Sequence, residues 1–296
     1  MKTVYHKADT RGFADHGWLK SYHSFSFANY YNPERMNFGV LRVLNDDQVA
    51  SGMGFGTHPH RDMEIISIPL EGDLEHKDSM GTSAVIRNGE IQVMSAGTGV
   101  QHSEYNKNKD ELVKFLQIWV IPNKMNVTPR YDQISIKENE KLNDYQQILS
   151  PNPDDEGVWI HQNAWFNLAK FEKANTKDYQ LHLSGNGVYV FVLKGSAKIG
   201  DQILDTRDGF GIWETKNFTL EALEDSENIV WDKIHCAAKK NGLKPVSVIY
   251  LINLLCLKMN LLNFFFEFFW DSLPSPLIKN MVTAAAMIKQ TPPTTT

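Results

Sequence analysis

The chain has 296 residues, with 30 basic and 35 acidic side chains and a formal net charge of −5 at neutral pH. This length can hold two domains that each bury a hydrophobic core. The negative charge argues against nucleic-acid binding through phosphate neutralisation. The two cysteines, Cys236 and Cys256, form no CxxC pair, which argues against a disulfide framework or a thiolate zinc site. The N-terminus lacks the apolar stretch of a secretory signal, so we expect a cytoplasmic protein.

Short β-favouring runs separated by turn residues extend from about Phe38 to Tyr105. They include EIISIPL, SAVIR and EIQVM, with turn signals at Glu71-Gly72-Asp73 and Asn88-Gly89-Glu90. Runs of this length joined by tight turns are typical of antiparallel strands. We therefore predict a mainly β protein in which residues 1–125 form an N-terminal barrel.

A second stretch, from Gly187 to Trp231, repeats this rhythm with the runs VYVFVL, SAKIG, DQILD and GFGIWE. Aligning ISIPLEGDLEHKD with VFVLKGSAKIGD places Gly72 opposite Gly195, which indicates a diverged internal repeat of a barrel. The proline-containing segment from about Ile121 to Leu183 is predicted to be a linker followed by the first strands of the second barrel. No His-x-His precedes the second copy, so we predict a C-terminal barrel over residues 126–232 without metal ligands.

Two pairs of polar residues have the spacing of a metal site. His58 and His60 are two residues apart, and so are His102 and Glu104. Residues i and i+2 of a strand point to the same face, so each pair can reach one ion. If the two strands are neighbours, three nitrogens and one carboxylate converge and leave open coordination positions. This donor set suits one divalent ion, with Fe(II) as the first expectation and Mn, Ni, Cu or Zn as alternatives.

Several blocks of the sequence resemble the pirin family of the cupin superfamily, and in particular its bacterial quercetin-dioxygenase-like members. The resemblance rests on HSFSFANYYNPERMNFGVLRVLNDD, GFGTHPHRDMEIISIPLEGDLEHKDSMG, QVMSAGTGVQHSEYN and FLQIWVIPNKMNVTPRYDQ, and it continues to IWETKNFTLEALEDSENIVWD. It implies a bicupin, with two antiparallel jelly-roll barrels and iron in the N-terminal barrel only. The ligand positions it implies are His58, His60, His102 and Glu104.

Other polar residues near these pairs have competing interpretations. Glu64 follows His-x-His closely and is a rival to Glu104 as the fourth ligand, or an acceptor for a ligand histidine; Asp62 is a weaker rival. We interpret His76 as a solvated or hydrogen-bonded strand histidine, with a catalytic role as the alternative. We expect structural roles for His16, His23 and Phe25, and turn roles for Ser95, Gly97 and Gly99.

Residues 233–296 extend beyond the resemblance. They contain an apolar run from Pro245 to Leu257 and another from Leu261 to Trp270. Lys258 and Glu267 fall within any window of the roughly 20 residues that a bilayer span needs, so we expect no membrane span. The alternatives are an amphipathic appendage and a gene-model extension, and the final TPPTTT is expected to be disordered.

The resemblance implies a metal-dependent dioxygenase that opens the central ring of a flavonol such as quercetin with dioxygen. Glu104, or alternatively Glu64, would accept the proton of the substrate hydroxyl as a general base. The alternative is a non-catalytic, iron-binding redox sensor that binds a protein partner, because one fold hosts many functions. A third possibility is an isomerase-like or hydrolytic metal cupin.

Overall fold

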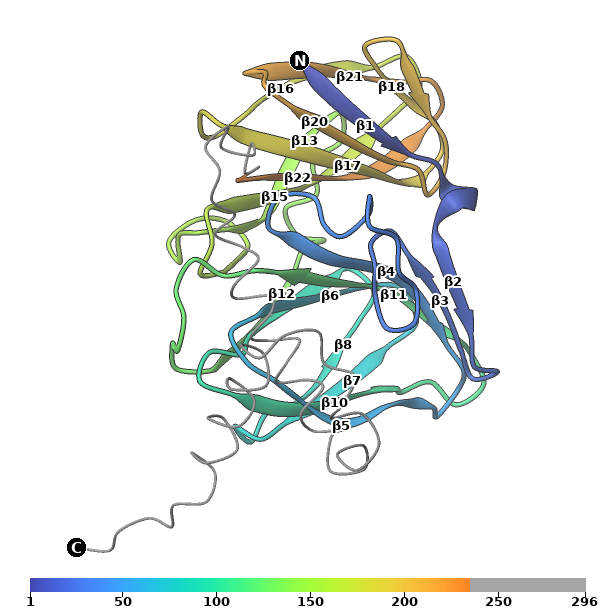
Figure 1. The fold of residues 1–296 in the computed structure, drawn as a ribbon. Coiled ribbons are helices and arrows are strands. Elements are labelled where there is room, and N and C mark those ends of the chain that lie inside the picture. The colour runs from blue at the N-terminus through green and yellow to red at the C-terminus, as the bar shows by residue number, and fades with distance from the viewer. Residues whose placement is uncertain (235–296) are drawn as a thin grey trace, which may run out of the picture. The chain divides into compact units, whose positions relative to one another are not determined.

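A computed structural model of the chain describes residues 1–234, and these fold into two β-barrels, which confirms the predicted mainly β bicupin (Figure 1). Each barrel consists of a seven-stranded sheet facing a four-stranded sheet. The N-terminal barrel contains β2 (Gly12–Asp15), β3 (Leu19–His23), β4 (Leu41–Val49), β5 (Gly54–His60), β6 (Glu64–Glu71), β7 (Leu74–Asp78), β8 (Ser83–Ile86), β9 (Glu90–Ser95), β10 (Val100–Asn106), β11 (Val113–Val120) and β12 (Arg130–Ser135).

The second barrel repeats the arrangement, with the sheet orders β1-β20-β17-β22-β15-β13-β14 and β16-β21-β18-β19. Its strands are β1 (Lys2–His6), β13 (Asp144–Ser150), β14 (Val158–Trp159), β15 (Ala164–Phe171), β16 (Thr176–Gln180), β17 (Asn186–Lys194), β18 (Ala197–Ile199), β19 (Gln202–Leu204), β20 (Gly209–Trp213), β21 (Asn217–Ala222) and β22 (Ser226–Ile234), and a short 3-10 helix η1 (Ala8–Thr10) follows β1.

Two strands pair across the predicted boundary between residues 125 and 126. β1 pairs with β20 in the sheet of the second barrel, although it begins the chain. β12 pairs with β9 in the first barrel, although it follows residue 125. Each barrel therefore includes a strand from the other side of that boundary. The domain limits themselves stay a prediction.

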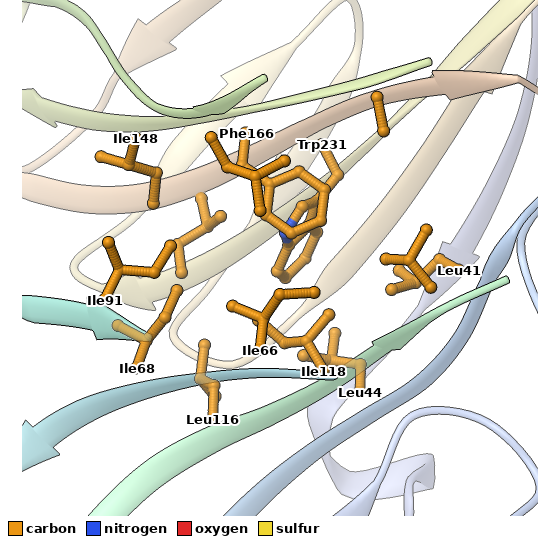
Figure 2. Packing of buried hydrophobic residues seen from close by; sticks show 14 of the residues in the cluster. Leu41, Leu44, Ile66, Ile68, Ile91, Leu116, Ile118, Ile148, Phe166 and Trp231 are labelled. Carbon is orange, nitrogen blue, oxygen red and sulfur yellow. The ribbon is translucent and has the colours of Figure 1, made fainter. Parts of the chain in front are cut away.

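The outer faces of the two seven-stranded sheets pack against each other and form the largest apolar cluster of residues 1–234. In Figure 2, Ile66, Ile118 and Leu44 of the first barrel face Phe166 and Trp231 of the second. Strands such as EIISIPL are apolar and buried on both faces because one face meets this layer and the other faces a barrel interior. The contact between the barrels is thus a hydrophobic core.

The interiors of the two barrels differ in composition. The interior of the second barrel is one apolar cluster that includes Val190, Phe210 and Leu220. The first barrel holds two small apolar clusters instead, one around Phe115 and one around Met94. Buried polar side chains occupy much of the rest, among them Asn45, Asp47, Ser67, His76, Gln92, His102, Glu104 and Gln117.

The internal repeat is visible at the turns after β6 and β17. Gly72 and Gly195 occupy these turns, with φ values of 72° and 76°. A β-carbon at Gly72 would lie 2.8 Å from the Leu112 carbonyl oxygen, and one at Gly195 would lie 2.2 Å from that of Asp225. Both positions therefore need glycine, for backbone angle and for space.

The predicted C-terminal extension lies almost entirely outside the described residues. β22 continues two residues beyond the predicted end of the second barrel, to Ile234. The apolar runs and the predicted disordered tail fall after that point. Within residues 1–234, no helix is long and apolar enough to cross a membrane.

Truncating a side chain in the layer between the barrels should destabilise the protein strongly. Phe166 is fully buried there, so we expect Phe166→Ala to lower the free energy of unfolding by about 3–5 kcal/mol. Urea denaturation measures this loss. Ile203→Ala, at a half-exposed position on β19, is the control and should change stability by about 0.5 kcal/mol or less. A similar, small loss in both variants would contradict a shared core between the barrels.

Candidate metal centre

Neighbouring strands β5 and β10 bring three of the four predicted residues, His58, His60 and His102, together. The strands are antiparallel, with His102 opposite His58 and Val100 opposite His60. His58 and His60 are half-buried, whereas His102 is buried. The arrangement therefore has an exposed side on β5 and a buried side on β10.

The three histidine rings form a compact triangle. Their centroids are 4.8 Å apart for His58 and His60, 4.5 Å for His58 and His102, and 4.9 Å for His60 and His102. One ring nitrogen from each lies within 4.8 Å of the others. This spacing allows all three imidazoles to bind a single ion.

The hydrogen bonds of these histidines leave nitrogens free to bind a metal. His58 donates from Nδ1 to the carbonyl oxygen of Gly56 at 2.7 Å, which leaves Nε2 as its lone-pair nitrogen. The Nε2 atoms of His60 and His102 are buried and have no hydrogen-bond partner among residues 1–234. Buried polar atoms are normally paired, and a bound ion would satisfy both. The residues therefore fit a divalent metal ion.

The protein environment keeps the buried imidazoles neutral. Burial, followed by repulsion from the neighbouring histidines, lowers the pKa of His60 to about 3 and that of His102 to about 3. An imidazole must be neutral to bind a metal ion. At neutral pH both rings are thus already in the form that binds metal.

Glu104 lies beside His102 in the barrel interior. Its carboxylate is fully buried and accepts hydrogen bonds from Ser67 Oγ at 2.9 Å and from Gln117 Nε2 at 3.3 Å. A register shift between His102 and Glu104 interrupts the pairing of β10 with β5. Potential ligand atoms of Glu104, His102 and His76 lie within 4.8 Å of one another and form a second group. This group has only His102 in common with the triangle of His58, His60 and His102.

Glu64 and Asp62 do not join the histidine cluster. Glu64 accepts a hydrogen bond from Ser95 Oγ at 2.6 Å and lies on the face of β6 opposite to Ser67. Asp62 lies in a turn with φ of 49° and accepts the backbone N–H of Asn126 at 2.6 Å. Neither belongs to a group of potential metal ligands among residues 1–234.

The three residues singled out before β4 lie in different surroundings. His23 lies inside the first barrel with Nδ1 2.9 Å from Asn45 Oδ1. Phe25 is buried in the layer between the barrels, and His16 is exposed. In the turn after β9, Gly97 and Gly99 have positive φ values of 44° and 135°.

His76 and Tyr131 approach the cluster from β7 and β12. His76 on β7 is fully buried, and its ring centroid is 5.2 Å from that of His102. Tyr131 on β12 packs over His76 with a centroid distance of 4.8 Å. The spacing of His76 and Asp78, two residues apart in EHKDS, is the one sequence signal that could have indicated this second layer.

Loss of a buried histidine should abolish metal binding. We expect His102→Ala to retain little metal, because it removes the nitrogen shared by both groups of potential ligands. Metal content measured after purification and dialysis checks this. His161→Ala, at a half-buried histidine next to Trp159, should bind metal normally. Full metal content in His102→Ala would refute the site.

Glu64 should affect stability rather than metal binding. Burial raises the pKa of Glu64 to about 7, from an ordinary value of 4.5. Between these pH values the folded protein binds more protons than the unfolded chain, so this group makes stability fall as pH rises. Between pH 5 and pH 8, the free energy of unfolding of Glu64→Gln should therefore be about 1–3 kcal/mol higher than that of the parent. Urea denaturation measures this difference, and the variant should keep its metal. Loss of metal from this variant would instead support Glu64 as a metal ligand.

Comparison with known proteins agrees with this architecture. The pirin family model matches residues 5–120, and the model for a quercetinase C-terminal cupin domain matches residues 147–232. A protein from Escherichia coli (strain K12) named quercetin 2,3-dioxygenase is 43% identical over 229 residues, which cover 76% of this chain and 96% of that protein. A pirin-like protein from Caulobacter vibrioides is 37% identical over 225 residues, covering 76% of this chain and 96% of the relative.

A solved structure of the bacterial pirin YhhW from Escherichia coli in complex with nickel(II) has a TM-score of 0.75 and 41% identity. The match covers 79% of this chain and 99% of that one. A quercetin 2,3-dioxygenase from Acinetobacter baumannii, at 22% identity and a TM-score of 0.65, has the same fold and covers 88% of this chain and 97% of its own. The two-barrel fold, the matching family models and the extent of the identity show that this chain belongs to the pirin family of cupin proteins.

Proposed function

We propose that this protein is an iron-dependent dioxygenase that opens the central ring of a flavonol such as quercetin. The observation that carries the proposal is the triangle of His58, His60 and His102, with two buried nitrogens that lack a partner among residues 1–234. Relatives that carry the quercetin 2,3-dioxygenase name support the substrate class. In the reaction, both atoms of dioxygen enter the ring-opened ester, and carbon 3 of the flavonol leaves as carbon monoxide.

We assign the metal to the Nε2 atoms of His58, His60 and His102 and to the carboxylate of Glu104. A divalent iron bound there would act as a Lewis acid toward the enolic hydroxyl of the substrate and would mediate electron transfer to dioxygen. The nickel(II) complex of the related YhhW supports a divalent ion in this family. The mixed nitrogen and oxygen donor set suits iron, and it also admits Mn, Ni, Cu and Zn.

The half-buried side of the cluster defines how a substrate would approach. His58 and His60 on β5 are half-buried, whereas His102 and Glu104 on β10 are buried. A flavonol hydroxyl would therefore reach the site past β5. Trp119 packs edge-on against His60 at 4.9 Å and provides an aromatic surface beside the cluster.

Glu104 is the proposed general base. Ser67 and Gln117 each donate a hydrogen bond to one of its two carboxylate oxygens, which limits its rotation. The burial of the group removes competing water. From this position the carboxylate would accept the proton of the enolic hydroxyl and return it to the carboxylic acid product.

The proposed activity is tested with protein purified without added metal and then loaded anaerobically with iron. We expect one iron per chain, loss of quercetin and release of carbon monoxide in equal amounts. One iron without turnover of any flavonol would sink the dioxygenase and favour the redox-sensing regulator that binds a protein partner. A chain that binds no divalent metal would remove both functions.

Replacing the proposed base should reduce turnover more than metal binding. Glu104→Gln keeps the size of the side chain and an oxygen donor, but its amide cannot accept the proton. We expect kcat to fall about 100-fold or more while iron is still bound, and both are measured on the loaded protein. Glu221→Gln, on β21 of the second barrel, is the control. Equal turnover in Glu104→Gln and the parent would leave Glu104 without a role as base.

A further inference from the structure

The buried histidine His76 has a hydrogen-bonding pattern that specifies the position of its proton. His76 Nε2 lies 2.9 Å from Asp78 Oδ2, and both side chains are fully buried. A carboxylate only accepts hydrogen bonds, so Nε2 carries the proton and donates it. The remaining nitrogen, Nδ1, is therefore a lone-pair acceptor.

The turn after β7 holds the Asp78 carboxylate in place through hydrogen bonds that it accepts. Its Oδ1 accepts the backbone N–H groups of Met80 at 2.9 Å and of Thr82 at 3.0 Å. Oδ2 is left to face His76. The turn after β7 thereby fixes the carboxylate, and the carboxylate fixes the tautomer of His76.

The acceptor nitrogen of His76 faces the ligand His102. The two Nδ1 atoms are 3.4 Å apart. One of a facing pair of nitrogens must carry a proton for a hydrogen bond to form, and His76 has none to give there. His102 therefore carries its proton on Nδ1 and presents a lone pair on Nε2, which is the buried nitrogen without a partner among residues 1–234.

We propose that His76 is the positioning residue that fixes His102 as an Nε2 metal ligand, in a chain that runs from Asp78 through His76 to His102. These hydrogen bonds set the tautomer and ring orientation of His102. The negative charge of Asp78 makes His102 Nε2 a stronger electron-pair donor to the metal. Tyr131 of β12 packs against the His76 ring and limits its movement. The inference rests on the metal site of the proposed function and not on its substrate.

The competing arrangement has His76 as a metal ligand itself. A nitrogen of His76 lies within 4.8 Å of potential ligand atoms of His102 and Glu104. An ion between His76 Nδ1 and His102 Nδ1 would turn the Nε2 atom of His102 away from the metal. The two arrangements thus place the proton of His102 on different nitrogens.

Two substitutions of His76 and one control test its role by zinc affinity, measured by competition with a chelator. His76→Phe keeps the ring shape but removes the acceptor, and we expect zinc affinity to fall roughly 10- to 100-fold. His76→Asn places an amide oxygen near the former Nδ1 and should recover most of that affinity. His6→Phe, at a buried histidine bonded to Tyr189, is the matched control and should bind zinc as the parent does.

Asp78→Asn tests the chain without changing either histidine. The backbone N–H groups of Met80 and Thr82 claim the amide oxygen, so the NH₂ group faces His76. His76 must then accept on Nε2 and carry its proton on Nδ1, where it opposes the proton of His102. We expect zinc affinity to fall in this variant although its shape and burial are unchanged.

Nitrogen NMR of the zinc-loaded parent reads the tautomers directly. We expect His102 to carry its proton on Nδ1 with Nε2 bound to zinc, and His76 to carry its proton on Nε2 with no metal bound. Zinc on Nδ1 of His76, or unchanged affinity in both His76→Phe and Asp78→Asn, would overturn the proposal. If the parent binds zinc through His102 but the iron-loaded parent turns over no flavonol, the dioxygenase is removed and this inference stands.

Discussion

The two seven-stranded sheets bury their outer faces against each other, and this contact permits the first barrel to have a polar interior. A barrel of this size would ordinarily depend on its own apolar interior for stability. Here Ile66, Ile118, Phe166 and Trp231 form a core outside both barrels. Together with the apolar interior of the second barrel, it provides hydrophobic burial that the first barrel lacks inside. The space within the first barrel is thereby free for ligands and their hydrogen-bond partners.

Hydrogen bonds then organise the polar interior around one cluster of nitrogens. Ser67 and Gln117 satisfy Glu104, and Asn45 pairs with His23 farther along the barrel. Burial costs little for neutral imidazoles and much for charged ones, which explains why His60 and His102 have lowered pKa values. The Nε2 atoms of His60 and His102, which have no hydrogen-bond partner among residues 1–234, are those that a metal would use. The same principle, applied to Asp78 and His76, extends the site to a second layer.

Strand periodicity made much of this predictable, and local backbone geometry limited it. The i, i+2 spacing placed His58 and His60 on one face of β5, and the turn residues indicated antiparallel strands joined by tight turns. Spacing alone could not exclude Glu64 as a metal ligand. The turn at Asp62 has a positive φ, so the alternation of side-chain direction along β5 does not continue into β6. His76 could be recognised as a candidate but not placed beside His102, and Tyr131 was not recognised, since their contacts arise from pairing between strands that are distant in sequence. The pairing of β1 with β20 is invisible for the same reason.

We infer that one divalent ion binds inside the first barrel, on the Nε2 atoms of the histidine triangle. A crystal structure of the iron-loaded protein, with anomalous scattering to locate the metal, tests this most directly. We expect one iron bound to the Nε2 atoms of His58, His60 and His102 and to a carboxylate oxygen of Glu104. Iron bound to His76, or to Glu64 in place of Glu104, would contradict it.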